Sequence, residues 1–327
     1  MAIIVTGSAG FIGYHVSLAL LARGERVVGI DNLNVYYDPA LKEARLARLE
    51  SHDRFASARL DVADLEAVRA LAQRHRSEVT GVIHLAAQAG VRHSLTAPFD
   101  YVHSNLEGHM VILEVCRHEL PGLRHLVYAS SSSVYGGNAK IPFAVEDRVD
   151  RPISLYAATK RANELMSHCY AHLYGIPQTG LRFFTVYGPW GRPDMAAYLF
   201  ADAIVHSRPI TLNNGGDMER DFTYVDDVVA GVLAALDRPP AGDGGPPHAL
   251  YNLGNHRPVP LRGFVRVLEE ALGREARIEL APLPPGDVVR TCADIAASTR
   301  DLGFEPRTTI EEGLPRFVEW YLDYHGV

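Results

Sequence analysis

The chain has 327 residues, 47% of them hydrophobic and 22% charged, a composition typical of one large globular domain or two smaller ones. A formal net charge of -7, without any dense basic run, gives no reason to expect nucleic acid or a membrane surface as a partner. Three scattered cysteines, no secretory signal and no apolar stretch of the ~20 residues that span a bilayer together predict a cytoplasmic protein.

The first thirty-one residues have the pattern of a mononucleotide-binding unit. A short apolar run at 3–5 predicts a strand buried on both faces of a parallel sheet. A glycine-rich turn, a helical pattern ending near Leu21 and a second strand at 26–30 follow. Such a turn lets a pyrophosphate approach the helix N-terminus, and its place in the unit makes a plain tight turn the weaker alternative. The predicted cofactor contacts are Gly7, Gly10, Phe11, Ile12 and Gly13.

Asp31 stands at the tip of the second strand, 18 residues after Gly13. That spacing is close to the one expected for a carboxylate that binds a ribose 2′-hydroxyl. A carboxylate there repels a 2′-phosphate, and Asn32 follows it in place of an arginine. We therefore predict NAD and not NADP, with Asp31 and Asn32 among its contacts.

Strands and helices continue to alternate, which predicts an α/β fold built on a doubly wound parallel sheet. Helices are expected at 39–50, 66–75, 101–119, 154–174 and 310–324, and strands at 55–60, 79–85, 123–129 and 178–184. Asp61 and Val62 follow the third strand and could border an adenine, although a helix cap at Asp61 or Asp64 fits equally well. Small residues after the fourth strand suit close approach of a cofactor, and the contacts predicted there are Leu85, Ala86, Ala87 and Gln88.

Four serines, 130–133, follow the strand at 123–129, at the sheet edge where ligands bind in open α/β folds. Tyr156 and Lys160 are four residues apart on the next helix and therefore share a face. A nearby cation favours the phenolate over a phenol whose ordinary pKa is about 10. A serine-rich turn and an ordinary amphipathic helix are the alternatives, and the preceding cofactor unit favours proton-transfer chemistry instead.

Together, the glycine turn, Asp31, the serine strand end and the Tyr156/Lys160 pair resemble the extended short-chain dehydrogenases/reductases over essentially the whole chain. Longer strings are most similar to the UDP-glucuronate 4-epimerases, and they lie at 31–38, 85–92, 179–195 and 219–227. The resemblance implies a Rossmann-like domain and a smaller mixed α/β substrate domain. The expected NAD-binding domain is 1–186 plus about 224–254, and the expected nucleotide-sugar domain is about 187–223 plus 255–327.

The resemblance also implies roles for single residues. Tyr156 matches the base of the family and Lys160 its activator and nicotinamide-ribose ligand. Ser131 matches the hydroxyl beside the reacting group, with Ser132 and Ser133 as adjacent alternatives. Related dehydratases carry Asp-Glu at 132–133 and related decarboxylases carry a glutamate there, so the serines favour simple epimerisation. Asn105, on the helix at 101–119, is a further cofactor candidate.

The expected substrate contacts come from several segments. Arg220 matches the family's diphosphate-binding arginine, although an ion pair with Glu219 or Asp221 is an alternative. Asp287 resembles a uridine-ribose ligand in what could also be a plain Pro-Gly-Asp turn. The remaining candidates are Ser131, Ser132 and Tyr156 beside the sugar, and Arg290 as a second phosphate contact.

A glucuronate substrate needs a partner for its carboxylate. Arg192 and Thr185 are the candidates, because a guanidinium and a hydroxyl can hold a carboxylate between them. An ion pair with Asp194 is the alternative for Arg192. Arg92 is a further basic group near the mouth of the site.

These observations predict an NAD-dependent enzyme that inverts C4 of UDP-glucuronate to give UDP-galacturonate through a transient 4-keto intermediate. The alternatives are a UDP-glucose or UDP-N-acetylhexosamine 4-epimerase and, from another class, a catalytically silent NAD-binding scaffold. The fifteen histidines form no metal motif, so no metal is expected. By resemblance alone, a homodimer is expected through the helices at 101–119 and 154–174.

Overall fold

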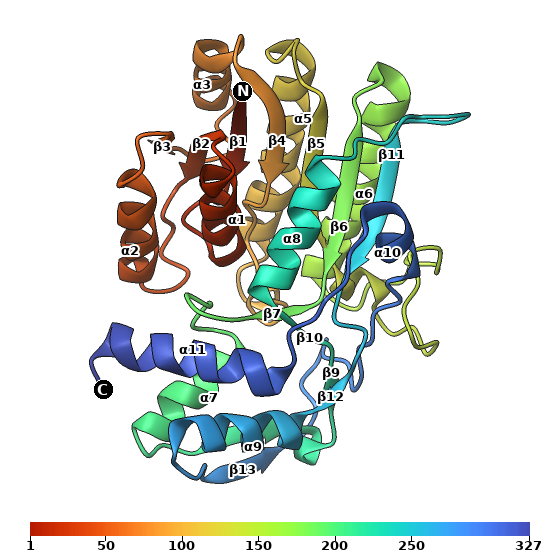
Figure 1. Ribbon diagram of the computed structural model, residues 1–327. Helices are drawn as coiled ribbons and strands as arrows, with labels where there is room; N and C mark the ends of the chain where they lie inside the picture. The colour runs from red at the N-terminus through yellow and green to blue at the C-terminus, as the bar shows by residue number, and fades with distance from the viewer.

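The computed structural model describes residues 1–327 and contains one seven-stranded sheet in which every pair of neighbours is parallel (Figure 1). The strand order is β11-β6-β5-β4-β1-β2-β3. The strands are β1 (Ala2–Thr6), β2 (Arg26–Asp31), β3 (Phe55–Arg59), β4 (Val79–His84), β5 (His125–Ser131), β6 (Gln178–Phe183) and β11 (His248–Leu253). The predicted α/β fold with a doubly wound parallel sheet is confirmed.

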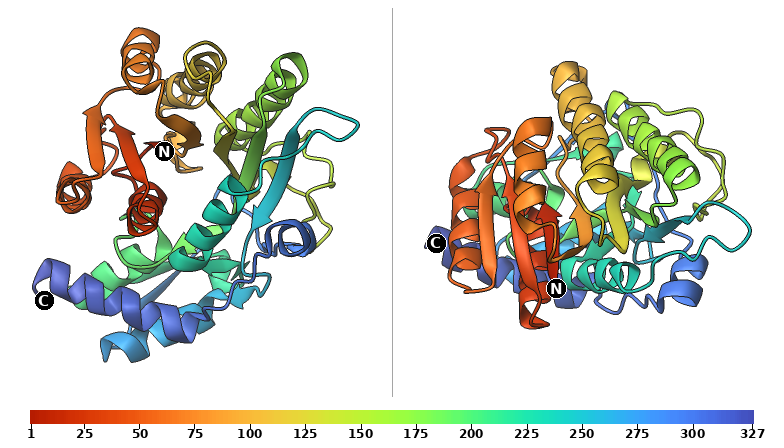
Figure 2. Two further views of the ribbon diagram at one scale, coloured as in Figure 1. Left: turned by 45° about the horizontal axis from the view of Figure 1, so that its top comes forward. Right: turned by 90° about the horizontal axis from the view of Figure 1, so that it is seen from above.

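Helices cover both faces of the sheet, as a parallel sheet requires (Figure 2). One face carries α1 (Phe11–Ala22), α2 (Pro39–Glu50) and α8 (Val225–Leu236), and the other carries α3 (Leu65–His75), α5 (Gly108–His118) and α6 (Leu155–Tyr174). No helix is long and apolar enough to cross a membrane.

Apart from α10 (Ala296–Leu302), which packs beside β11 and α8, the remaining elements lie beyond the carboxyl ends of the strands, below the sheet in Figure 1. They include β7 paired with β10, β9 paired with β12, and β8 paired with β13. Their bounds are β7 (Thr185–Tyr187), α7 (Ala196–Val205), β8 (Ile210–Asn213), β9 (Glu219–Arg220), β10 (Phe222–Tyr224), β12 (Val259–Pro260), α9 (Leu261–Leu272), β13 (Ile278–Ala281), α10 (Ala296–Leu302) and α11 (Ile310–His325). We propose that the NAD-binding domain is 1–186 plus about 224–254, and that the nucleotide-sugar domain is about 187–223 plus 255–327, as the sequence predicts.

The segment predicted as one helix over 101–119 is divided into three. It consists of α4 (Pro98–Tyr101), a π-helical turn (Val102–Glu107) and α5. Asn105, inside the π-helical turn, points inward and exchanges hydrogen bonds with the backbone of Gln88. A π-helical turn re-aims one side chain without ending the helix, and such turns are frequent at functional sites. Shorter helical turns lie at His93–Leu95, Ser132–Tyr135 and Asn214–Gly216.

A buried ion pair fixes α6 against the sheet. Arg182 on β6 donates to both carboxylate oxygens of Glu164, at 2.7 Å from Nε and 2.9 Å from Nη2. Ser130 on β5 donates to the same carboxylate at 2.7 Å, and both charged side chains are at most 1% exposed. Burial alone raises the pKa of Glu164, but the hydrogen bonds and charge of Arg182 outweigh it and hold the pKa below its ordinary 4.5.

Replacing Glu164 by glutamine should lower the free energy of unfolding by about 3 kcal/mol, because Arg182 keeps a buried charge without its partner. A carboxylate whose pKa is lowered by folding stabilises the protein above its unfolded-state pKa and loses that contribution as the pH falls. The difference between variant and wild type should therefore narrow below pH 4.5. Urea denaturation at about pH 7 and about pH 3.5 measures both effects. Glu305→Gln, in an exposed pair with Arg307, is the matched control and should change little. A Glu164→Gln protein as stable as the control would contradict the assignment.

Candidate active site

One large cavity, about 1110 Å³ in volume, lies at the carboxyl ends of the strands, where ligands bind in open α/β sheets. It is lined both by the strand ends of the sheet and by residues from the elements beyond them. Most of the residues predicted from the sequence line it: Gly7, Gly10, Phe11, Ile12, Gly13, Asp31, Asn32, Asp61, Val62, Leu85, Ala86, Ala87, Gln88, Arg92, Ser131, Ser132, Tyr156, Lys160, Thr185, Arg192, Arg220 and Asp287.

The glycine turn between β1 and α1 fits a bound phosphate group. A Cβ at Gly13 would lie 2.0 Å from the carbonyl oxygen of Gly7, so only glycine permits this tight turn. No side chain caps α1, and the backbone N–H groups of Phe11 and Ile12 find no partner in the protein. Unpaired N–H groups at a helix N-terminus attract anions, so the turn suits the pyrophosphate of a dinucleotide.

Asp31 and Asp61 lie at the ends of β2 and β3 and border the same part of the cavity. Asp31 accepts hydrogen bonds from the backbone N–H groups of Ala9 (3.1 Å) and Leu33 (2.9 Å). Asp61 accepts one from the side chain of Asn32 at 3.1 Å. Asp64, and not Asp61, caps a helix: its side chain accepts a hydrogen bond from the backbone N–H of Ala67 at the start of α3.

Two of the predicted contacts do not line the cavity. Asn105 is buried behind the wall, where it bonds to the backbone of Gln88 and to the hydroxyl of Thr159 at 3.0 Å. It therefore supports Gln88 from behind. Arg290 is half-exposed and forms an ion pair with Glu219 at 2.6 Å. The sequence could not show that these two side chains lie outside the cavity, because both residues neighbour segments that do reach it.

Tyr156 and Lys160 lie on one face of α6, as their spacing predicts, and Ser131 faces them from the end of β5. The ammonium group of Lys160 donates to the backbone carbonyl of Ala129 at 2.9 Å. Burial lowers the pKa of Lys160 to about 8. Ser131 is held in turn by Ser133, whose backbone N–H donates to the Ser131 hydroxyl at 3.1 Å.

The expectation that Lys160 lowers the pKa of Tyr156 is wrong for this structure. Burial dominates and raises the pKa of Tyr156 above its ordinary 10.0. The hydroxyl of Ser131 and the positive charge of Arg192 act in the lowering direction, and the charge of Asp194 opposes them. The cation that influences the phenol therefore comes from across the cavity, because Lys160 directs its ammonium group toward the sheet.

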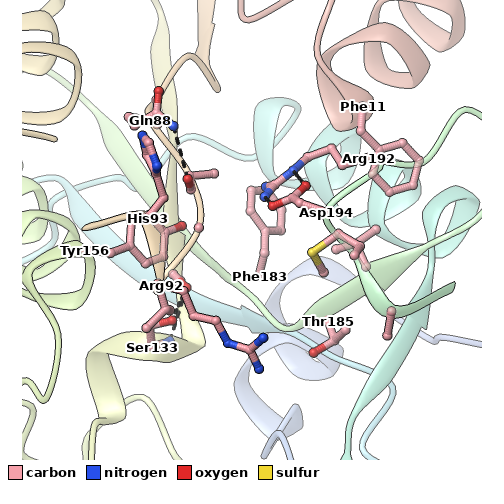
Figure 3. A pocket seen from close by; sticks show the side chains of 18 of the residues that line it. Phe11, Gln88, Arg92, His93, Ser133, Tyr156, Phe183, Thr185, Arg192 and Asp194 are labelled. Carbon is pink, nitrogen blue, oxygen red and sulfur yellow. Dashed lines mark hydrogen bonds and ion pairs between the residues drawn. The ribbon is translucent and has the colours of Figure 1, made fainter. Parts of the chain in front are cut away.

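Arg192 and Thr185 lie on the wall that faces Tyr156 and Ser133 (Figure 3). Arg192 forms the ion pair with Asp194 that was the alternative to a substrate contact, and it lines the cavity as well. Its loop is fixed by Arg45 on α2, which is fully buried. Arg45 donates to the carbonyls of Trp190 (2.6 Å) and Ala9 (2.9 Å), and so joins this loop to the glycine turn.

Three charged residues meet at the mouth of the cavity. Asp287 accepts from Arg220 at 3.0 Å and from Arg92 at 3.3 Å. Arg220 therefore pairs with Asp287 and not with Glu219 or Asp221. Burial lowers the pKa of Arg220, and its guanidinium still carries its charge, so two cations and one anion leave a net positive charge here. A positive mouth suits a diphosphate.

Tyr36 and Asp194 also line the cavity, although the sequence predicts no site role for Tyr36 and only an ion pair with Arg192 for Asp194. The hydroxyl of Tyr36 donates to Asp194 at 3.0 Å. The two residues are 158 positions apart in the chain, so only the fold brings them together. Their presence inside the two long strings at 31–38 and 179–195 was the available signal. The sequence also did not predict the apolar residues of the cavity, because the fold brings them together from distant positions. They are Leu199, Phe200, Ile210, Met218 and Phe222.

Comparison with known proteins places these features in context. Residues 3–254 match the profile of the NAD dependent epimerase/dehydratase family. UDP-glucuronate 4-epimerase 4 of Arabidopsis thaliana is 48% identical over 335 residues, which cover 99% of this chain and 76% of the relative. This similarity confirms the predicted resemblance to UDP-glucuronate 4-epimerases.

Solved structures give the same result. UDP-glucuronic acid 4-epimerase from Bacillus cereus, in complex with UDP-glucuronic acid and NAD, matches with a TM-score of 0.90 and 32% identity, covering 99% of this chain and all of the other. A UDP-glucose 4-epimerase from Thermotoga maritima, solved with UDP-glucose, matches with a TM-score of 0.89 and 29% identity over 99% and 100% of the two chains. NAD, the predicted cofactor, is confirmed, and this chain belongs to the NAD dependent epimerase/dehydratase family.

Proposed function

We propose that this enzyme is a UDP-glucuronate 4-epimerase that interconverts UDP-glucuronate and UDP-galacturonate. The observation that carries the proposal is Arg192, a cation on the cavity wall that faces Tyr156. A neutral hexose has no need of a guanidinium beside the reacting ring, whereas a hexuronate carries a carboxylate there. Relatives named UDP-glucuronate 4-epimerase, 48% identical over nearly the whole chain, support it.

NAD would be held by the glycine turn, Asp31, Asp61 and Lys160, and it supplies reversible hydride acceptance at the sugar's C4. Each catalytic cycle returns the hydride, so the cofactor stays bound and is not consumed. The carboxylate of Asp31 matches a ribose hydroxyl and would repel a 2′-phosphate. The protein's own residues then have to bind the sugar, move one proton and let the ring turn.

Tyr156 takes the proton from the C4 hydroxyl as a phenolate and returns it after inversion. Ser131 lies between Tyr156 and the substrate hydroxyl and relays the proton. The charge of Arg192 makes the phenolate less costly in a buried site, since it acts to lower the pKa of Tyr156. Lys160, held by the carbonyl of Ala129, positions the cofactor's ribose beside Tyr156.

Inversion requires that the 4-keto sugar turn over while the nucleotide stays fixed. Arg220 binds the diphosphate and Asp287 the uridine ribose, with Arg92 as a further phosphate contact at the mouth. The volume of about 1110 Å³ leaves room for the ring to rotate. Ser132 and Ser133 stand where dehydratases carry carboxylates, so no acid or base is available there for elimination after oxidation.

The similar UDP-glucose 4-epimerase fold supports a second candidate, an enzyme for neutral UDP-hexoses. Arg192 argues against it. A silent NAD-binding scaffold would have no use for Ser131, Tyr156 and Lys160 gathered at one cavity. The predicted homodimer also remains a proposal, supported by exposed Met110 on α5 and exposed Leu165 and Leu173 on α6. The cytoplasmic location stays a prediction.

Purified protein incubated with UDP-glucuronate, without added NAD, should form UDP-galacturonate, detected by proton NMR of the sugar. Tyr156→Phe should lower the rate by at least about 100-fold, because the base that takes the hydroxyl proton is lost. A pentose product would indicate decarboxylation instead. If UDP-glucuronate stays unchanged with NAD supplied while UDP-glucose is converted, the proposed function is wrong.

Bound NAD should be lost more readily as the pH rises past about 8, the pKa of Lys160. The sign follows from the charge: Lys160 is protonated below that value, and above it loses the ammonium group that donates to Ala129 and positions the cofactor's ribose. The NAD that stays with the protein after gel filtration at about pH 6 and at about pH 10 measures this, with the melting temperature at each pH as the control for unfolding. Equal retention of NAD at the two pH values would refute it.

Arg192→Gln should lower kcat/KM for UDP-glucuronate by about 100-fold, because two charge-assisted hydrogen bonds to the carboxylate are lost. UDP-glucose, which has no carboxylate, should lose only about 10-fold, because for this substrate Arg192→Gln removes just the charge that favours the Tyr156 phenolate. Arg300→Gln removes an arginine from an exposed ion pair with Asp301 and is the control. Equal losses on the two substrates would remove Arg192 from carboxylate recognition.

A further inference from the structure

We propose that Asp194 is a positioning residue that holds the guanidinium of Arg192 with one edge toward itself and the other toward the substrate carboxylate. The inference rests on the proposed function and extends it to the residue that aims the recognition group. No role was assigned to Asp194 from the sequence beyond an alternative ion pair.

The ion pair has a defined orientation. Arg192 Nε donates to Asp194 Oδ1 at 3.0 Å, and Nη2 donates to Oδ2 at 2.5 Å. These two bonds engage the Nε side of the planar guanidinium group. Nη1 has no hydrogen-bond partner in the protein and is not among its buried unpaired polar atoms. The group is therefore fixed along one edge and open along the other.

The open edge is the part that a carboxylate can use. An arginine carries five N–H donors, and Asp194 takes one from Nε and one from Nη2. Both hydrogens of Nη1 and one of Nη2 remain. One hydrogen of Nη1 and the remaining hydrogen of Nη2 point in parallel, and together they form the fork that binds a carboxylate through two hydrogen bonds. Arg192 can therefore bind Asp194 and a sugar carboxylate at the same time, so Asp194 need not be displaced.

Asp194 is itself held in place by Tyr36. The Tyr36 hydroxyl donates to Asp194 Oδ2 at 3.0 Å, and its ring packs against His93 with centroids 4.8 Å apart. Burial raises the pKa of Tyr36 to about 12, so the hydroxyl keeps its proton. Burial also raises the pKa of Asp194, but the charge and hydrogen bonds of Arg192 outweigh it and keep the carboxylate ionised. Tyr36, Asp194 and Arg192 thus form a chain that ends in the cavity.

Positioning matters because of the chemistry of the intermediate. The 4-keto form of a glucuronate is a β-keto acid. If the bond from C5 to the carboxyl carbon aligns with the π system of the C4 carbonyl, that bond breaks and carbon dioxide leaves. The electron pair passes to the C4 oxygen as an enolate, and protonation at C5 then gives a 4-keto pentose. A guanidinium fixed in direction holds the carboxylate out of that alignment, whereas a mobile one does not.

The test is Asp194→Asn, measured on UDP-glucuronate and UDP-glucose. The asparagine amide offers one acceptor oxygen in place of two, and its NH₂ group cannot accept from the guanidinium. Arg192 is then held less firmly, so KM for UDP-glucuronate should rise by about 10-fold. The pentose fraction of the products should rise with it, while UDP-glucose kinetics should change by less than about 2-fold. Asp237→Asn, which removes the carboxylate of an exposed two-bond pair with Arg23, is the matched control. Melting temperatures and retained NAD check that each variant is folded.

The outcomes separate this inference from the proposed function. Wild-type protein that leaves UDP-glucuronate unchanged refutes the proposed function. If the wild-type protein converts UDP-glucuronate and the Asp194→Asn variant has an unchanged or lower KM, the positioning role is refuted. A lower KM would show that Asp194 competes with the substrate carboxylate for Arg192.

A double-mutant cycle checks that Asp194 acts through Arg192. If it does, Asp194→Asn added to Arg192→Gln should cause no further loss on UDP-glucuronate. Tyr36→Phe should give a smaller change in the same direction as Asp194→Asn, because it removes one hydrogen bond to the carboxylate and leaves the ion pair. Additive losses in the double variant would show that Asp194 has a separate, structural role.

Discussion

The buried pair of Glu164 and Arg182 is the constraint on which the catalytic half of this protein depends. It joins α6 to β6, and Ser130 adds β5 to the same carboxylate. Tyr156, Lys160 and Glu164 follow one another at intervals of four along α6, so fixing Glu164 also fixes the face that carries the proton-transfer pair. Two ions buried together cost much desolvation free energy, and four hydrogen bonds to the Glu164 carboxylate, the fourth from Arg161 on α6, offset it.

The opposite wall is organised around another buried arginine. Arg45 donates to carbonyls of the glycine turn and of the loop that carries Arg192, so cofactor and substrate contacts are fixed relative to each other. The loop places a cation opposite Tyr156 and its counter-ion, Asp194, beside it. Burial raises the pKa of the phenol, and this cation from across the cavity acts against that effect. The same arginine can therefore influence both the acid–base chemistry and the choice of sugar.

Local patterns predicted the first half of the fold and its last helix. Apolar runs, turn glycines and helix boundaries placed the six strands up to Phe183 and the helices α1, α2, α3, α6 and α11 to within a few residues, because each depends on side chains that are close in sequence. The elements between β6 and α11 were not predicted. The helix at 101–119 was predicted without its π-helical turn, since the hydrogen bonds between Asn105 and Gln88 that accompany the turn are tertiary. For the same reason the sequence predicts Asn105 as a cofactor contact, whereas it lies behind the cavity wall and bonds to Gln88. Arg290 is a cation three residues after Asp287, which lines the cavity, and only packing shows that Arg290 pairs with Glu219 outside the cavity.

The sequence by itself predicted the reaction type, from a glycine turn suited to a pyrophosphate, an acid placed for a ribose hydroxyl, and a serine, a tyrosine and a lysine on one strand end and the next helix. These relations are local, so residue spacing reveals them. The tertiary structure alone decided how the charges are paired. Tyr36 reaches Asp194, Asp287 joins Arg92 to Arg220, and Lys160 turns to Ala129 and away from the role of lowering the tyrosine's pKa. Ion pairing depends on distance in space and on burial, and neither follows from distance along the chain.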